Sequence, residues 1–164
     1  MASTDLIKEL RARTGAGIMD CKRALDETDQ DAVKAEKLLK EWGLASAAKK
    51  AGRAASQGIV DCYVHAGGRI GAMVEVNCES DFVARTEDFK ALVHDVAMQV
   101  AAMNPSRISR DEPSPDGTED VPLLEQAFIR DPSRTIQDLV NETIAKLREN
   151  VVIRRAARFE LGAQ

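Results

Sequence analysis

Two short runs in the middle of the chain have the composition of β-strands. Ile59–His65 and Arg69–Val76 are rich in β-branched and other apolar residues, and apolar and polar residues alternate from Val74 to Asn77. Ala66-Gly67-Gly68 lies between the two runs, and glycines at this spacing are typical of tight turns between antiparallel strands. The pattern predicts a β-hairpin.

Apolar residues recur at helical spacing in the first 43 residues. Leu6, Ile7 and Leu10 fall on one face of a first helix, which ends at the glycines within residues 14–17. A second short helix follows, and then a third that we expect to end at Gly43. The pattern predicts a compact domain of three helices, residues 1–43.

The remaining residues predict a connector and a second domain. Residues 44–56 are rich in Ala, Lys and Arg, which favours a helical connector, and residues 57–164 form the expected core domain. After the hairpin, Thr86 is a suitable cap for an amphipathic helix. A loop rich in proline and acidic residues spans about 106–122, and a short helix is expected around 123–128.

The end of the chain completes this domain. Thr135 can cap a last helix, and Val151–Leu161 has the composition of a closing strand. The order is three helices, then ββαααβ. It predicts an α+β fold in which a small antiparallel sheet carries helices on one face.

Composition and charge narrow the class of protein. Hydrophobic residues make up 44% of the chain and charged residues 30%, as in a globular protein. The net charge of −4 argues against direct binding to nucleic acid, which usually requires a basic surface. No apolar run approaches the roughly 20 residues that span a bilayer, and the N-terminal residues lack the apolar core of a signal peptide. We therefore expect neither a nucleic acid nor a membrane as partner.

The sequence contains no pattern of a catalytic or metal site. It has no Gly-rich phosphate loop with Lys and Ser or Thr, and no GxSxG motif. Cys21, Cys62 and Cys78 form no CxxC pair, and we expect all three to be buried thiols. Acidic neighbours of Cys78 disfavour a thiolate, although a thiol enzyme using Cys78 stays an alternative. We expect no cofactor and no metal, and a function carried by surfaces.

One position breaks the strand pattern. Ser80-Asp81-Phe82 follows the second strand directly and precedes the helix that Thr86 caps. A large apolar side chain beside a carboxylate at such a corner suits insertion into another protein. The alternative interpretation is a turn at the start of a helix, with Phe82 packed against its own domain.

Two long runs resemble the signatures of one family. Leu10–Leu25, LRARTGAGIMDCKRAL, is similar to the N-terminal signature of elongation factor Ts, and Glu75–Arg85, EVNCESDFVAR, to its second signature. The similarity continues through Arg148–Arg155 and Arg158–Leu161, so it covers nearly the whole chain. Members of this family are guanine-nucleotide exchange factors for elongation factor Tu in translation elongation. The resemblance therefore implies a cytoplasmic exchange factor that is not itself an enzyme.

The resemblance also implies how the corner acts. In the family, a Thr-Asp-Phe corner enters the nucleotide-binding domain of elongation factor Tu and disturbs the bound Mg²⁺ and the phosphate-binding loop. The corresponding residues here are Ser80, Asp81, Phe82 and Val83, with Ser in place of Thr.

Further contacts are implied elsewhere in the chain. The N-terminal helices resemble the ubiquitin-associated-like domain with which family members touch the same partner, and Leu10, Arg11 and Met19 lie in its signature. Leu10 and Met19 would otherwise belong to the core of the bundle. His65 lies in a hairpin motif that contacts another region of the partner in the family. Its alternative interpretation is a histidine at a strand end that faces water.

The chain resembles a short form of the family, with one core subdomain where long members have two. A sheet of three strands has exposed edges, and small cores often gain stability by association. Because two-fold symmetry is the commonest solution, we expect a homodimer joined through the sheet region, including Val151–Leu161. The remaining alternative is a protein-binding adaptor built on the N-terminal bundle.

Overall fold

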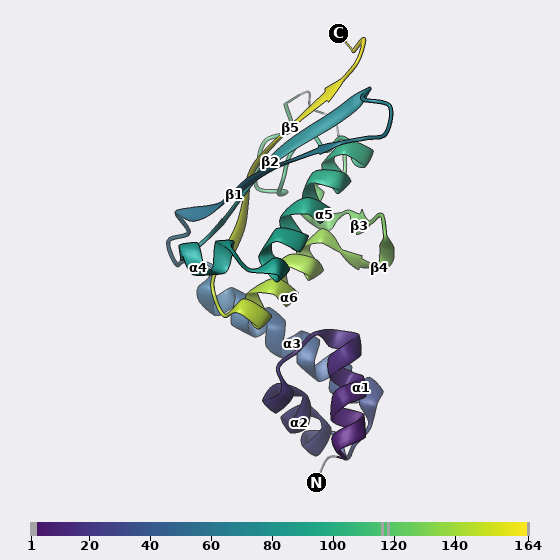
Figure 1. The fold of residues 1–164 in the computed structure, drawn as a ribbon, viewed down its shortest axis with the longest axis vertical. Coiled ribbons are helices and arrows are strands. Elements are labelled where there is room, and N and C mark those ends of the chain that lie inside the picture. Colours follow the sequence, from purple (N-terminus) through teal and green to yellow (C-terminus); the bar gives the residue numbers. More distant parts are fainter. Residues whose placement is uncertain (1–2, 116, 118, 164) are drawn as a thin grey trace. The chain divides into compact units, whose positions relative to one another are not determined.

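A computed structural model describes residues 3–115, 117 and 119–163 of the chain, which form two compact units (Figure 1). One unit contains Met1–Gly52 and Asn141–Arg148, and the other contains Arg53–Val140 and Glu149–Gln164. Helices and a small antiparallel sheet are both present, so the predicted α+β class is confirmed.

Three helices near the N-terminus build the helical unit: α1 (Thr4–Thr14), α2 (Ile18–Glu27) and α3 (Ala32–Lys50). Gly15 ends α1 with a φ of 68°, a left-handed backbone that glycine adopts without steric cost. Mostly small buried side chains form the core, which allows the helices to approach closely; they are Leu10, Cys21, Ala24, Leu25 and Ala35.

The helix α3 is longer than predicted. It passes through Gly43 and continues to Lys50, so most of the expected connector 44–56 is the last part of this helix. A glycine inside a helix costs only about 1 kcal/mol, and the alanines and lysines that follow are strong helix formers. Gly43 is buried, and a Cβ there would lie 3.7 Å from the Cβ of Ala145. The expected stop at Gly43 was therefore wrong.

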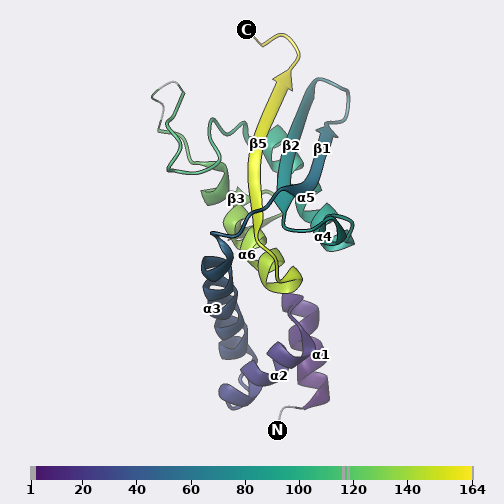
Figure 2. The same ribbon diagram turned by 90° about the vertical axis from the view of Figure 1, so that its left-hand side faces the viewer.

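The second unit is built on an antiparallel sheet with strand order β1-β2-β5. The strands are β1 (Gln57–Val64), β2 (Ile70–Cys78) and β5 (Val151–Glu160), which confirms the predicted hairpin and closing strand. Figure 2 shows them side by side, with β2 in the middle and α5 (Glu87–Met103) behind them. The valines and Phe89 of α5 are buried in the core beneath the sheet.

The segment after α5 differs from the prediction. The short helix expected around 123–128 is a single 3-10 turn, Leu123–Glu125, followed by a two-stranded hairpin of β3 (Ala127–Phe128) and β4 (Asp131–Thr135). Gln99, buried in α5, determines this path. Its side chain donates to the carbonyl of Ala127 at 3.1 Å and accepts from the backbone N–H of Ile129 at 3.0 Å. The helix α6 (Ile136–Leu147) then follows.

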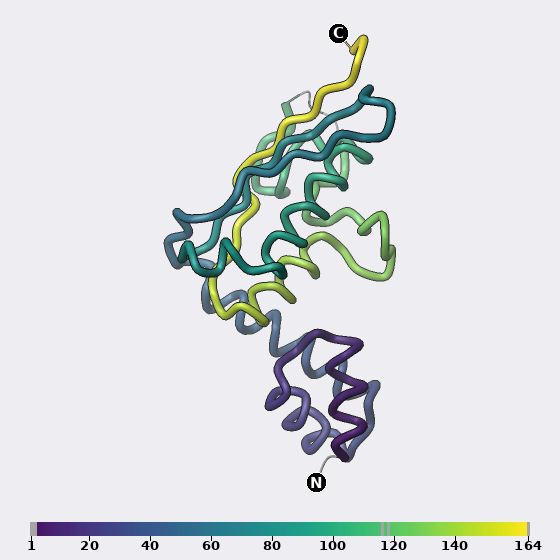
Figure 3. Tube along the Cα trace, viewed as in Figure 1, coloured from purple at the N-terminus to yellow at the C-terminus, as the bar shows by residue number. Residues whose placement is uncertain are grey.

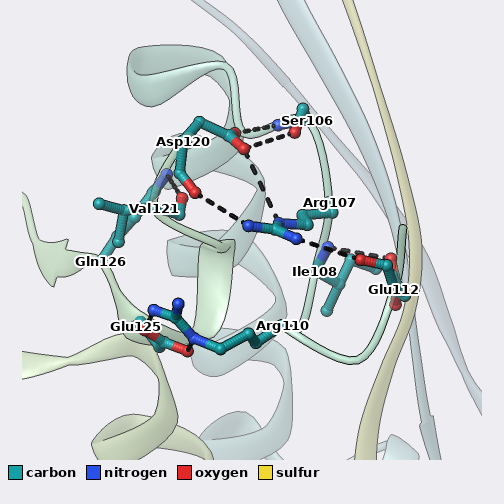
Figure 4. A network of polar contacts seen from close by, with 9 residues as sticks. All are labelled: Ser106, Arg107, Ile108, Arg110, Glu112, Asp120, Val121, Glu125 and Gln126. Atoms are coloured by element: carbon teal, nitrogen blue, oxygen red, sulfur yellow. Dashed lines mark hydrogen bonds and ion pairs between the residues drawn. The ribbon is translucent and has the colours of Figure 1, made fainter. Parts of the chain in front are cut away.

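The predicted loop lies between α5 and that turn, and the tube in Figure 3 follows its path. Polar contacts hold its two ends together (Figure 4). The hydroxyl and backbone N–H of Ser106 both donate to the carboxylate of Asp120, at 2.7 and 2.8 Å, and these bonds lower the pKa of Asp120. Arg107 donates to the backbone carbonyls of Glu112 and Asp120. The loop is therefore closed by its own side chains.

Candidate functional site

The corner after β2 is a single helical turn held at both ends. This turn, α4 (Asp81–Ala84), lies between the end of β2 and the start of α5. The Ser80 hydroxyl accepts from the backbone N–H of Val83 at 3.3 Å, as an N-cap. Thr86 caps α5, as predicted, and its hydroxyl also donates to the carbonyl of Val83 at 2.7 Å. The corner is thus joined directly to the rigid helix that follows.

Phe82 projects from this corner into solvent. Its side chain is 76% exposed, so the interpretation in which Phe82 packs against its own domain was wrong. Asp81 is next to it and pairs with Arg85 one turn later, with 2.8 Å between Oδ2 and Nη2. Val83 is half-buried, and Ala84 is the residue of the turn that faces the core. The corner therefore presents an apolar side chain beside a carboxylate.

A carboxylate from the other end of the chain supports the corner. Glu149, two residues before β5, accepts the backbone N–H groups of Glu79 and Ser80 at 3.1 and 3.0 Å, and the Ser80 hydroxyl at 2.6 Å. Sequence reasoning missed this residue. The one signal in the sequence was that Glu149 lies just before the predicted closing strand, which we expected to join the hairpin in one sheet.

The N-terminal residues singled out from the sequence separate into buried and exposed. Leu10 is 1% exposed and packs in the core of the helical unit, as its alternative interpretation has it. Met19 at the start of α2 is 71% exposed, next to the exposed Ile18. Arg11 on α1 is exposed as well. The interpretation of Met19 as a core residue is contradicted.

His65 closes the turn of the β1-β2 hairpin and is exposed. Its backbone N–H donates to the carbonyl of Ile70 at 2.9 Å. Its Nδ1 lies 3.1 Å from the hydroxyl of Tyr63, and the ring of Tyr63 packs edge-on against His94 of α5. Tyr63 therefore restrains the ring of His65 while leaving it open to solvent.

The outer face of the sheet, away from α5, exposes apolar side chains. Paired residues lie in rows across the strands: Cys62 beside Met73 and Ala157, and Val64 beside Gly71 and Phe159. Met73 is 50% exposed and Phe159 76%. A third row ends this patch with a charged pair, Glu75 and Arg155 at 2.7 Å. We refer to the first two rows as the outer apolar face.

The cysteines do not form a reactive site. Cys78 is fully buried, its thiol donates to the carbonyl of Ser80 at 3.1 Å, and burial together with the charge of Glu149 raises its pKa to about 11. A thiol this rarely ionised is a poor nucleophile, which argues against the thiol-enzyme alternative. Cys21 is buried too, but Cys62 is exposed on the outer apolar face, so the expectation of three buried thiols was wrong.

The part of the chain that the structure describes contains neither a grouped metal site nor a helix that spans a membrane. There, no three or more His, Cys, Asp or Glu side chains are grouped so that they could hold a metal ion. None of the helices there combines the length and the apolar composition needed to cross a membrane.

Comparison with known proteins gives consistent matches. The family model described as elongation factor TS matches residues 44–117. The chain is 50% identical to elongation factor Ts of Thermoanaerobacter sp. (strain X514) over 195 aligned positions, which cover 99% of this chain and 96% of the relative. It is 48% identical to elongation factor Ts of Caldanaerobacter subterraneus subsp. tengcongensis, covering 99% and 98%. For that of Herpetosiphon aurantiacus the identity is 47%, covering 98% of both chains.

Proposed function

The chain belongs to the elongation factor Ts family of translation elongation factors, and from this premise we propose that it promotes the release of GDP from elongation factor Tu. The observation that carries the proposal is the exposed side chain of Phe82 beside Asp81, on a corner fixed by hydrogen bonds at both ends. An exposed phenylalanine on a turn held by hydrogen bonds adds little to the core of its own domain, and it is preorganised for a pocket in another protein.

The corner acts as a wedge in this proposal. GDP is held by its phosphate contacts and by Mg²⁺, which neutralises their charge. Burying Phe82 in the partner yields roughly 1.5–3 kcal/mol, and only in a partner state that opens to admit it. The carboxylate of Asp81 competes for groups that support the metal. The wedge therefore stabilises the state of elongation factor Tu that holds nucleotide weakly.

This coupling explains how a factor with no active site accelerates exchange. Coupling between two ligands is reciprocal, so a factor that weakens GDP binding is itself bound more weakly when a nucleotide is present. A fresh nucleotide then displaces the factor. The chain makes and breaks no covalent bond in this role and needs no cofactor.

Two further surfaces contribute to the contact with elongation factor Tu. In the helical unit, Arg11 and Met19 supply a polar and an apolar contact, and Leu10 supports them from the core beneath. On the hairpin, His65 contacts a second region of the partner, with its ring restrained by Tyr63. The factor acts in the cytoplasm, where elongation takes place, and its net charge of −4 agrees with contact to a protein rather than to nucleic acid.

The chain also forms a homodimer in this proposal, through the outer apolar face. Met73, Val64 and Phe159 are exposed there together, and apolar patches of this kind mark interaction sites. A second copy related by a two-fold axis would cover both apolar rows at once. The strands β1 and β5 are the outermost strands of this sheet. Unpaired strand edges are normally covered, which also favours association with a second chain.

The release of labelled GDP from purified elongation factor Tu tests the exchange function. The chain at catalytic concentration should accelerate release severalfold or more, and unlabelled GDP in excess should not substitute for it. The adaptor alternative predicts binding without any change in the release rate. Unchanged release in the presence of saturating chain would therefore refute the proposed function.

A further inference from the structure

Side-chain contacts take over at the point where the backbone pairing of β2 and β5 ends. Cys78 and Val151 are the last pair of the ladder. One residue beyond, the backbone N–H of Asn150 donates to Oε1 of Glu79 at 2.7 Å. Two residues beyond, Glu149 receives three bonds from Glu79 and Ser80. The corner is therefore tied to the start of β5 through carboxylates in both directions.

This set of contacts closes on itself. Arg53, at the start of the same unit, places Nη1 3.5 Å from Oε1 of Glu79, and its carbonyl accepts from the side-chain amide of Asn150 at 2.8 Å. The cation of Arg53 offsets the proximity of the two carboxylates of Glu79 and Glu149. We call the four residues Arg53, Glu79, Glu149 and Asn150 the corner clamp.

The hydrogen bonds that Glu149 accepts are strong because its side chain is charged. A carboxylate that accepts backbone N–H groups forms charge-assisted bonds, roughly twice as strong as those between neutral groups. The Ser80 hydroxyl donates to Oε1 of Glu149 and at the same time accepts from the N–H of Val83. Hydrogen bonds in such a chain polarise and strengthen one another. Glu149 thus reaches through Ser80 into the first turn of α4.

The corner depends on tertiary contacts. The helix α4 has four residues, far fewer than an isolated helix needs to be stable in water. Phe82 is exposed and contributes no packing to its own unit, and the pair between Asp81 and Arg85 lies within the turn itself. Tertiary contacts of the corner therefore come from the buried Ala84, the thiol of Cys78, the Thr86 cap and Glu149.

We propose that Glu149 is a positioning residue for exchange: it holds the backbone of Glu79 and Ser80 so that Asp81 and Phe82 are presented in one orientation. This inference rests on the proposed function. Small displacements of a reacting or wedging group are costly, because a shift of about 1 Å can reduce a rate by about a hundredfold. Without the carboxylate, the corner samples several orientations, and only a fraction of them enter the partner.

The test compares Glu149→Gln with Glu125→Gln. The amide keeps the shape of Glu149 but loses the charge, and only one of its two polar atoms accepts hydrogen bonds. Glu125 belongs to the same unit and also loses a bonded carboxylate, since it pairs with Arg110. With elongation factor Tu·GDP, Glu149→Gln should lower the maximal rate of GDP release about tenfold or more. The half-saturating concentration should change much less, and Glu125→Gln should match the wild type.

Amide hydrogen exchange supplies a second readout that is independent of activity. In Glu149→Gln, the amides of Glu79, Ser80 and Val83 should exchange faster, while those of Val74 and Val76 in β2 should keep their protection. Ser80→Ala removes the hydroxyl that joins Glu149 to the N–H of Val83, keeps the two backbone bonds to Glu149 and should give a milder loss of rate. Because Ser80→Ala leaves the Glu149 carboxylate in place, it covers the case in which Glu149→Gln does not fold.

The outcomes separate the two proposals. The positioning role is overturned if the wild type accelerates GDP release and either Glu149→Gln or Ser80→Ala is fully active. A uniform loss of protection throughout β2 also overturns it, because Glu149 would then be a general stabiliser. If the wild type does not accelerate release at all, the proposed function fails. The amide measurement then decides alone whether Glu149 orders the corner.

Discussion

The carboxylate of Asp81 and the guanidinium of Arg85 lie 2.8 Å apart, one turn apart on the corner after β2. The side chains are 47% and 76% exposed, and exposed pairs of this spacing contribute only about 0.3–0.5 kcal/mol. The pair orients Asp81 beside Phe82, yet a partner can replace it with contacts of its own at little cost.

Phe82→Ala and Asp81→Ala should each slow the stimulated release of GDP by tens-fold, because buried anchors at interfaces typically cost about 2 kcal/mol on truncation. Arg85→Ala removes only the exposed pair and should have a much smaller effect. Stopped-flow release of a fluorescent GDP measures the rates. Met103→Ala, at another apolar side chain that is half exposed, is the control. Full activity of the Phe82, Asp81 double variant would contradict the wedge.

Substitution of Leu10 should affect stability, and substitution of Met19 should affect binding to the partner. Leu10→Ala leaves a cavity in the core of the helical unit and should lower its free energy of unfolding by about 2–5 kcal/mol. Met19→Ala should change stability by less than about 0.5 kcal/mol, since the side chain is exposed, but it should weaken binding to elongation factor Tu. Denaturant unfolding and calorimetry measure the two quantities. Val33 is equally exposed in the same unit, so Val33→Ala should bind as the wild type does. Equal affinities of the wild type, Met19→Ala and Val33→Ala would exclude Met19 from the contact.

Met73→Asp should dissociate the homodimer. The substitution places a charge at the centre of the outer apolar face, where dimer formation would bury it without a partner. Sedimentation equilibrium at micromolar concentration should give a dimer mass for the wild type and a monomer mass for the variant. Met103→Asp is a matched control, because Met103 is also 50% exposed but lies at the end of α5. A monomer mass for the wild type would rule out the dimer.

Alkaline pH should destabilise the second unit through Cys78. Its pKa is raised from 9.0 to about 11 in the folded chain, so the folded state binds the proton more tightly than the unfolded state. This contribution is complete below pH 9 and is lost as the pH rises toward 11, which amounts to about 2–3 kcal/mol. Urea unfolding between pH 8 and pH 10.5 measures the loss, and Cys78→Ala should show a correspondingly shallower dependence on pH. Parallel pH profiles for the two chains would contradict the assignment.

Local patterns in the sequence determined which segments are helices and strands. The hairpin follows from strand-forming runs around Ala66-Gly67-Gly68, and α5 follows from the cap at Thr86 and the apolar stripe after it. These features depend on residues a few positions apart, so they are legible without the fold. The two long motifs indicated the family in the same way.

Tertiary packing determined the local structure at two places where the sequence pattern predicted it wrongly. The sequence favoured a helix stop at Gly43, but the helix-forming residues beyond it and the close approach of Ala145 allow α3 to continue. The segment around 123–128 has apolar residues that suit a helix, yet the buried amide of Gln99 bonds to its backbone and draws it into a hairpin. Ala145 is far from Gly43 in the sequence, and Gln99 is far from the segment around 123–128.

The candidate site shows the same division. The sequence by itself determined that Ser80, Asp81 and Phe82 stand at a corner and that Leu10 and Met19 share one motif. Only the tertiary structure decided that Phe82 and Met19 are exposed, that Leu10 is buried and that Glu149 holds Ser80. The physical reason is that helix and strand formation depends on near neighbours. Exposure and the bonds of the corner clamp instead depend on the register of β2 against β5, which joins residues about seventy positions apart.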